Sequence, residues 1–212
     1  MKNKSIPLLI EFFAFFILLP ISLVLPFSIR LKILLVLLGF GYVLFILKKA
    51  AHINFRIKKD LAWRSFFRRI LIMFPLVVLI TTVYVWLLDK DALFFVPKTN
   101  FKGYLVILFV YTFFSVWPQE IIYRTFFFER YEKLFKSSSL FIFVNAIVFS
   151  LAHLFFRNTL VLVLTFIGGL LFGYTYLRYR STTAVSLEHA LYGSWLYTVG
   201  MGQMLGFPGM ED

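Results

Sequence analysis

Long apolar runs alternate along the chain with short polar, mostly basic stretches, and this pattern predicts membrane-spanning helices. A helix needs about 20 apolar residues to cross the hydrocarbon core of a bilayer. Seven runs come close to or exceed that length, at residues 6–29, 31–47, 70–88, 102–128, 139–156, 159–177 and 183–206. They are continuous rather than alternating, which excludes a transmembrane β-barrel. We therefore expect an all-α, polytopic transmembrane helix bundle of seven to eight helices, because Pro118 either kinks the long run 102–128 or splits it in two.

Composition supports the same class of protein. The chain has 212 residues, of which 61% are hydrophobic and 15% charged, whereas a soluble domain is about half apolar and about a quarter charged. A single membrane domain over residues 1–212 is expected. The first run, 6–29, is longer than the core of a signal peptide and no small-residue cleavage site ends it, so it is expected to be a retained transmembrane helix. The absence of cysteine excludes disulfides, thiolate metal ligands and a cysteine nucleophile.

The net charge of +12 would suggest nucleic acid as a partner if the protein were soluble. Here the basic residues lie in short connecting segments, where they set the topology and meet anionic headgroups. We therefore expect the lipid bilayer, and no nucleic acid, as a partner. With a cytoplasmic N-terminus, fifteen of the 22 lysines and arginines lie inside, six lie outside and Arg124 lies in the membrane. This bias predicts that the N-terminus is cytoplasmic.

The stretch at residues 52–69 mixes aromatic and basic residues and contains His52. It is compatible with a helix lying on the cytoplasmic surface and equally with a basic loop. In the sixth run, Gly169 and Gly173 form a small-xxx-small pair, which predicts close packing against a neighbouring helix.

Polar side chains within the predicted spans are candidate functional residues, because each charge there costs about 2.5–3.5 kcal/mol on insertion scales. The candidates are Glu11, Gln119, Glu120, Arg124, Asn145, His153, Glu188, His189 and Gln203. Glu11 is isolated near the start of the first run, so we expect it at the interface or paired within the bundle.

Three of these candidates are expected to converge. Glu120 and Arg124 are spaced i, i+4 and can pair on one helix face, while Asn145 and His153 share a face in the fifth run. Glu188 and His189 are adjacent and must point in different directions, so only one of them is expected to face the cavity of His153. At ~1.5 Å per residue, Glu120, His153 and His189 are expected to meet in the cytoplasmic half to the middle of the bundle.

One carboxylate and two imidazoles in an apolar cavity suit the hydrolysis of an amide. The carboxylate can take a proton from water, and the imidazoles can orient that water or donate to an oxyanion. The same groups could hold a divalent metal such as zinc, but the spacing differs from H-E-x-x-H and nothing local requires a metal. Metal dependence therefore stays open.

Three motifs in this order resemble those of the CAAX protease and bacteriocin-processing family (CPBP, also called Abi), which are multi-pass intramembrane proteases. The family's E-E-x-x-x-R corresponds to Q-E-I-I-Y-R at residues 119–124, F-x-x-x-H to F-S-L-A-H at 149–153, and H-x-x-x-N to H-A-L-Y-G at 189–193. The resemblance covers about residues 102–206, the expected protease-like core. It implies a catalytic role for Gln119, Glu120, Arg124, His153 and His189.

Two positions depart from the family pattern. Gln119 stands where the family has its first glutamate, and Gly193 stands where it has a small polar residue. The resemblance implies that the first glutamate and the second-motif histidine activate water, and that the third-motif histidine and its polar companion stabilise the oxyanion. A glutamine cannot act as a base. Three readings follow: Glu120 takes over the base role, Asn145 or Glu188 replaces the missing polar groups, or the chain is non-catalytic.

The sequence thus favours an intramembrane endopeptidase acting on a peptide or protein in or near the membrane. The alternative from the same scaffold is a non-catalytic binding or bacteriocin-immunity protein. A transporter is a weaker alternative, since no paired broken helices mark two corresponding halves. Small size and short loops favour a bacterial inner-membrane protein, whose substrates would be peptide precursors or bacteriocin leaders rather than the prenylated CAAX tails expected for eukaryotic members.

Overall fold

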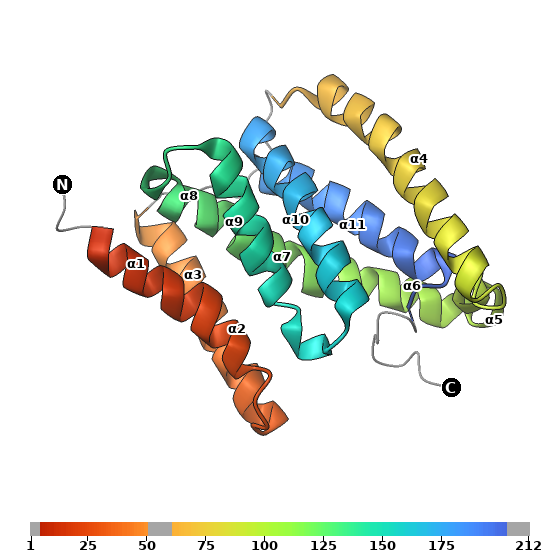
Figure 1. The fold of residues 1–212 in the computed structure, drawn as a ribbon, viewed down its shortest axis with the longest axis horizontal. Helices are drawn as coiled ribbons and strands as arrows, with labels where there is room; N and C mark the ends of the chain where they lie inside the picture. The colour runs from red at the N-terminus through yellow and green to blue at the C-terminus, as the bar shows by residue number, and fades with distance from the viewer. Residues whose placement is uncertain (1–4, 51–60, 203–212) are drawn as a thin grey trace. The chain divides into compact units, whose positions relative to one another are not determined.

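The computed structural model describes residues 5–50 and 61–202, and every regular element in these two ranges is a helix (Figure 1). The expected all-α class is confirmed. Gln203, His52 and the rest of the aromatic and basic stretch up to residue 60 lie outside the described residues. The helices form two compact units, the first comprising residues 1–56 and 121–178 and the second residues 57–120 and 179–212. Each unit is described by itself.

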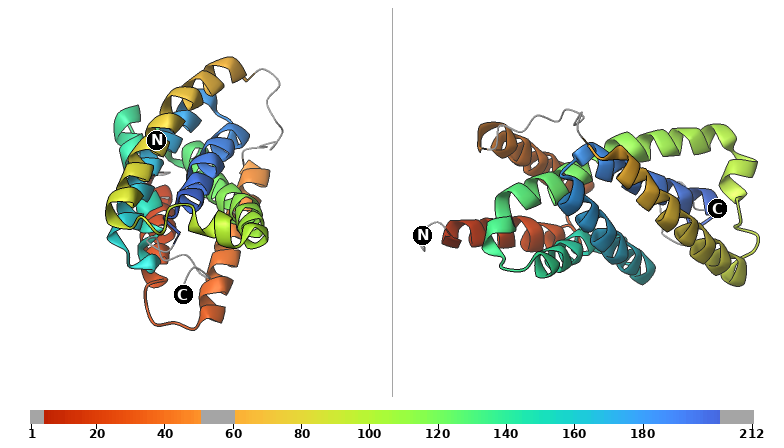
Figure 2. Two further views of the ribbon diagram at one scale, coloured as in Figure 1. Left: turned by 90° about the vertical axis from the view of Figure 1, so that its right-hand side faces the viewer. Right: turned by 90° about the horizontal axis from the view of Figure 1, so that it is seen from above.

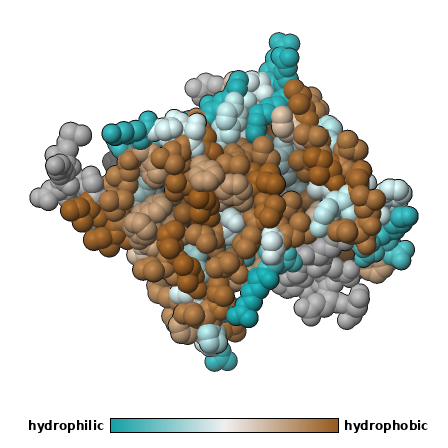
Figure 3. Space-filling view, in the orientation of Figure 1, coloured by the Kyte–Doolittle hydropathy of each residue, from teal (hydrophilic) through white to brown (hydrophobic). Residues whose placement is uncertain are grey.

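Five helical runs in the described ranges are long and apolar enough to cross a membrane: Ile29–Lys49, Trp63–Leu88, Phe101–Leu134, Ser138–Phe156 and Thr159–Tyr179. A shorter apolar helix covers Ile6–Ser22, so the first span ends seven residues before the predicted boundary at 29. Hydrophobic side chains cover most of the face drawn in Figure 3, as expected for surfaces that meet lipid acyl chains. The protein is therefore a multi-pass membrane protein.

The last helix, α11 (Thr182–Val199), is not among those five runs. It is more polar than they are, and it carries Glu188 and His189. It ends at Val199 because Gly200 adopts a left-handed conformation with φ 107°, which favours glycine at a helix C-terminus. The predicted extension of this span to residue 206 is therefore wrong.

The first unit begins with one apolar segment made of α1 (Ser5–Phe13), the π-helical η2 (Ala14–Leu18) and α2 (Leu19–Ser22), followed after a turn by α3 (Ile29–Ala50). Figures 1 and 2 show these helices in red and orange. The unit continues with η4 (Ile121–Phe126), α8 (Phe127–Tyr131), η5 (Glu132–Leu134), α9 (Ser138–Leu151), η6 (Leu154–Phe156) and α10 (Thr159–Tyr179). Buried aromatic side chains form much of its core, with edge-to-face contacts around Phe16 and Tyr131.

Two sequence expectations are resolved inside this unit. A Cβ atom at Gly169 would lie 2.7 Å from the Ala146 Cα, so the glycine lets α10 approach α9 closely, as predicted. Glu11 is paired: Arg130 Nη2 donates to its Oε2 at 2.7 Å and the Tyr131 hydroxyl donates to its Oε1 at 2.6 Å.

The second unit contains α4 (Trp63–Leu88), α5 (Phe95–Thr99), α6 (Phe101–Val110), the π-helical η3 (Tyr111–Val116), α7 (Trp117–Glu120) and α11. Helices α4 and α11 lie side by side, with α6 next to α5 at one end (Figures 1 and 2). Helix α4 begins at Trp63 rather than at 70, because Phe66 is buried against Tyr179 and draws this turn into the helix. Within the stretch 52–69, the loop reading is therefore wrong for residues 63–69, which form the first turns of α4, and the surface-helix reading stays a prediction.

The run Phe101–Leu134 is continuously helical and is not split at Pro118. Pro118 has no N–H to donate and its ring collides with the carbonyl one α-helical turn earlier. Two π-helical stretches, η3 before it and η4 after it, provide the wider turns that adjust the backbone around the proline. Such π turns recur at functional sites; η3 precedes the first motif, and η4 contains its second half.

Candidate active site

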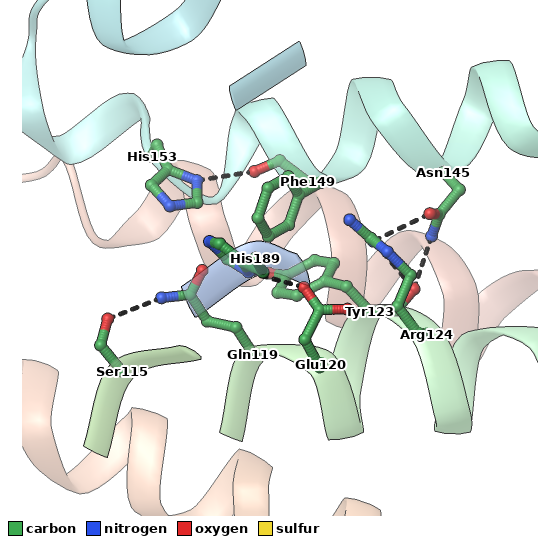
Figure 4. A network of polar contacts seen from close by, with 9 residues as sticks. All are labelled: Ser115, Gln119, Glu120, Tyr123, Arg124, Asn145, Phe149, His153 and His189. Atoms are coloured by element: carbon green, nitrogen blue, oxygen red, sulfur yellow. Dashed lines mark hydrogen bonds and ion pairs between the residues drawn. The ribbon is translucent and has the colours of Figure 1, made fainter. Parts of the chain in front are cut away.

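The first and third motifs meet within the second unit through Glu120 and His189 (Figure 4). Glu120 ends α7 and its side chain is fully buried, while His189 lies on α11 and is 7% exposed. The His189 Nδ1 atom lies 2.7 Å from Glu120 Oε1, although the residues are 69 positions apart. An ionised carboxylate only accepts hydrogen bonds, so this geometry places the proton on Nδ1 and leaves the lone pair on Nε2.

The neighbouring carboxylate, Glu188, points to α4, whereas His189 points to α7. Arg69 Nη1 of α4 donates to Glu188 Oε1 at 2.6 Å, and the Glu188 side chain is fully buried. The expectation that Glu188 and His189 face different sides is therefore confirmed. Sequence reasoning missed Arg69 as the partner, because it placed this arginine in a connecting stretch before the helix.

Gln119 precedes Glu120 on α7 and is held by the preceding turn. Its Nε2 donates to Ser115 Oγ at 2.8 Å. Its Oε1 is buried and has no hydrogen-bond partner among the described residues. A buried amide oxygen of this kind is an acceptor available to a water molecule or to a substrate N–H.

Gly193, the second departure from the family pattern, lies against Tyr111. A Cβ atom at Gly193 would overlap the Tyr111 hydroxyl oxygen, so only glycine fits there without a shift of the tyrosine. The Tyr111 ring also makes an edge contact with His189, with centroids 6.1 Å apart. Sequence reasoning did not single out Tyr111, although its spacing of four from Ser115 and eight from Gln119 was visible.

Arg124 and Asn145 form a buried cluster in the first unit (Figure 4). Arg124 Nη1 donates to Asn145 Oδ1 at 2.9 Å, and Asn145 Nδ2 donates to the Tyr123 carbonyl at 2.7 Å. The guanidinium carbon lies 4.6 Å from the centroid of the Phe149 ring, within the range of a cation–π contact. Two residues of different motifs, Arg124 and Phe149, thus pack together. The pairing of Arg124 with Glu120 stays a prediction.

His153 belongs to the same unit but lies in a turn rather than in the helix predicted for it. Helix α9 ends at Leu151, and His153 has φ −98° and ψ 5°. Its Nδ1 lies 2.8 Å from the Phe149 carbonyl oxygen, which only accepts, so Nδ1 carries the proton and Nε2 is an acceptor. The helical face predicted for Asn145, Phe149 and His153 therefore stops at Phe149.

No group of three or more histidine, aspartate or glutamate side chains that could hold a metal occurs in the ranges that the structure describes. Glu120 and His189 alone would be an incomplete ligand set for zinc, which takes three protein ligands at a catalytic site. The residues in hand therefore do not define a metal centre.

Fold and site together define a polytopic helical membrane protein with a buried carboxylate–imidazole pair. Residues 101–195 match the model of the family described as Type II CAAX prenyl endopeptidase Rce1-like. The resemblance to CAAX proteases predicted from the motifs is thus confirmed over this region, which contains all three of them. No curated protein and no solved structure matches the chain.

Proposed function

We propose that this protein is an intramembrane endopeptidase of the CAAX-protease type that hydrolyses a peptide bond of a membrane-associated substrate. The observation that carries the proposal is the 2.7 Å contact between Glu120 and His189. It joins two of the family's motifs inside the matched region, and both side chains are buried in a protein where such groups are costly.

The pair supplies a general base. Glu120 accepts a hydrogen bond from His189 Nδ1–H and so fixes the imidazole tautomer. His189 Nε2 then takes a proton from a water molecule as the water oxygen attacks the substrate carbonyl carbon. Glu120 then stabilises the imidazolium. The proton passes to the leaving nitrogen as the C–N bond breaks, giving a carboxylic acid and an amine.

The remaining motif residues have supporting roles in this proposal. Gln119 cannot take a proton, but its buried Oε1 can accept a hydrogen bond from the attacking water and orient it. The family resemblance implies that His153, the second-motif histidine, takes part in activating water. Arg124, held by Asn145, fixes the helix that carries the first motif.

The matched family's description names CAAX prenyl endopeptidases, so a prenylated CAAX peptide is the first substrate to test, with short peptide precursors as the second. The excess of basic residues on one set of connecting segments supports a cytoplasmic N-terminus. A bacterial plasma membrane is the proposed location.

The test is cleavage of an internally quenched, farnesylated CAAX peptide by the purified chain in detergent micelles. Glu120→Gln and His189→Ala should each lower kcat by about 10³-fold or more, as losses of base components do. Glu129→Gln is the matched control, because it makes the same change at an exposed position on the same helical run. Wild-type kcat in both motif variants would refute the proposal.

Gln119 favours a second candidate, a non-catalytic binding or immunity protein, because its amide replaces a carboxylate and is held by Ser115. This candidate predicts that the cellular phenotype survives Glu120→Gln and His189→Ala at unchanged protein levels. Loss of the phenotype in both variants would exclude it.

A further inference from the structure

The face of α11 that carries His189 also holds the ring of Tyr111. His189, Gly193 and Tyr197 are spaced by four and lie on one side of the helix. The Tyr111 ring contacts His189 at a centroid distance of 6.1 Å and Tyr197 at 5.2 Å, both edge to face. Between these two contacts its hydroxyl occupies the space beside Gly193. All four residues belong to the second unit.

The space beside Gly193 and between the His189 and Tyr197 rings, here called the Tyr111 slot, fixes the direction of the hydroxyl. Two aromatic neighbours restrict the rotation of the ring, and the missing side chain at residue 193 makes room for the oxygen. The structure gives the Tyr111 hydroxyl no hydrogen bond to another described residue. A donor of fixed direction, half-buried next to an imidazole, is the arrangement that stabilises a developing negative charge best, because little reorganisation is needed during the reaction.

The glycine at position 193, where the family has a polar residue, has a simple physical explanation. A polar side chain at position 193 would project one turn from His189, into the volume that the Tyr111 hydroxyl now fills. The chain thus places a donor at this point from η3 instead of from α11. A phenylalanine would fill the slot equally well in a purely structural role, so the hydroxyl is the informative group.

We propose that Tyr111 is a catalytic residue whose hydroxyl donates a hydrogen bond to the oxyanion of the tetrahedral intermediate. The inference rests on the proposed function. As water attacks, the carbonyl π bond opens and its electron pair moves to the oxygen, which Tyr111 stabilises without giving up its proton. When the carbonyl re-forms, the C–N bond breaks and His189 gives the proton that it took from water to the leaving nitrogen.

The test uses the full chain and the farnesylated CAAX peptide described above. Tyr111→Phe should lower kcat by ~10²-fold, the usual effect of removing one oxyanion donor, with KM changed less than about twofold because ground-state binding is untouched. Tyr104→Phe is the matched control. Its hydroxyl also contacts α11, at Thr198 Oγ1 2.8 Å away, but lies about 13 Å along the helix from His189. Its kcat should stay near that of the wild type.

A second experiment moves the hydrogen-bond donor from position 111 to position 193 and tests whether activity returns. Tyr111→Ala empties the slot and should lower kcat at least as far as Tyr111→Phe. Adding Gly193→Asn places an amide donor in the vacated volume, and kcat should recover about tenfold relative to Tyr111→Ala, a fraction of the contribution of one oxyanion donor. Unfolding midpoints of all variants are measured, so that a loss of folded protein is not read as a loss of catalysis.

The outcomes are separable. If Tyr111→Phe retains wild-type kcat while Glu120→Gln is inactive, the oxyanion role is overturned and the protease function stands. If Tyr104→Phe loses as much kcat as Tyr111→Phe, packing explains the effect and the role is also overturned. If the wild type cleaves neither the prenylated peptide nor a peptide precursor, both proposals fall.

Discussion

His189 Nδ1 on α11 lies 2.7 Å from Glu120 Oε1 on α7. The carboxylate is fully buried and the imidazole is 7% exposed, so in the proposed mechanism the imidazole links Glu120 to the reacting centre. The proposed mechanism requires the two residues to act together, so that neither side chain keeps its role when the other is removed.

The kinetics of the double variant test whether Glu120 and His189 act together. Glu120→Gln and His189→Ala should each lower kcat strongly, and Glu120→Gln/His189→Ala should lose no more than the worse single variant, because groups that act together are non-additive. Steady-state cleavage in micelles measures this. If the losses in the double variant multiply, the residues act independently and the proposed base is wrong.

The Tyr111 slot predicts a steric effect at Gly193. Gly193→Ala should destabilise the protein by about 1–3 kcal/mol, the usual cost of overpacking, since its Cβ overlaps the Tyr111 hydroxyl. Thermal unfolding in detergent measures the change. Gly41→Ala is the control: nothing lies within 4 Å of its Cβ position, and alanine in a helix is favoured over glycine by about 0.5–1 kcal/mol. Equal stability of the two variants would contradict the slot.

The Arg69–Glu188 pair predicts a thermodynamic coupling between α4 and α11. Removing one partner, as in Glu188→Leu, should cost about 3–5 kcal/mol because it leaves a buried charge. Arg69→Met/Glu188→Leu should recover much of that loss, since both charges are then gone. Arg64→Met, at an exposed position on the same helix, should be nearly neutral. Additive losses in the double variant would show that the contact is not energetically coupled.

Asn145 is predicted to support Arg124 rather than to act in catalysis. Asn145→Leu removes the acceptor for Arg124 Nη1 and should lower the free energy of unfolding by about 1–3 kcal/mol, or somewhat more because the donor is charged. Unfolding in denaturant measures it, with Phe143→Leu as an apolar change at an exposed position on α9. An unchanged unfolding midpoint in Asn145→Leu would contradict the supporting role.

Much of the fold could be predicted because it depends on local patterns. Apolar length alone predicts helices, and the all-α membrane class follows from it. Helix ends were less predictable. The start of α4 at Trp63 depends on burial of Phe66 against Tyr179, and the turn at His153 depends on where α9 stops. A run of apolar residues does not reveal such tertiary contacts.

By itself the sequence determined the transmembrane bundle, the order of the three motifs and the identity of Glu120 and His189 as candidates, because chain hydrophobicity and residue spacing are local properties. Only the tertiary structure decided which groups pair: Glu120 with His189, Glu188 with Arg69, and Tyr111 with Gly193. In the two hydrogen-bonded pairs, the partners are 69 residues apart (Glu120 and His189) and 119 residues apart (Arg69 and Glu188). The physical reason is that helix rotation and packing, which bring distant side chains together, arise from many contacts at once and leave no signal in the spacing of any single motif.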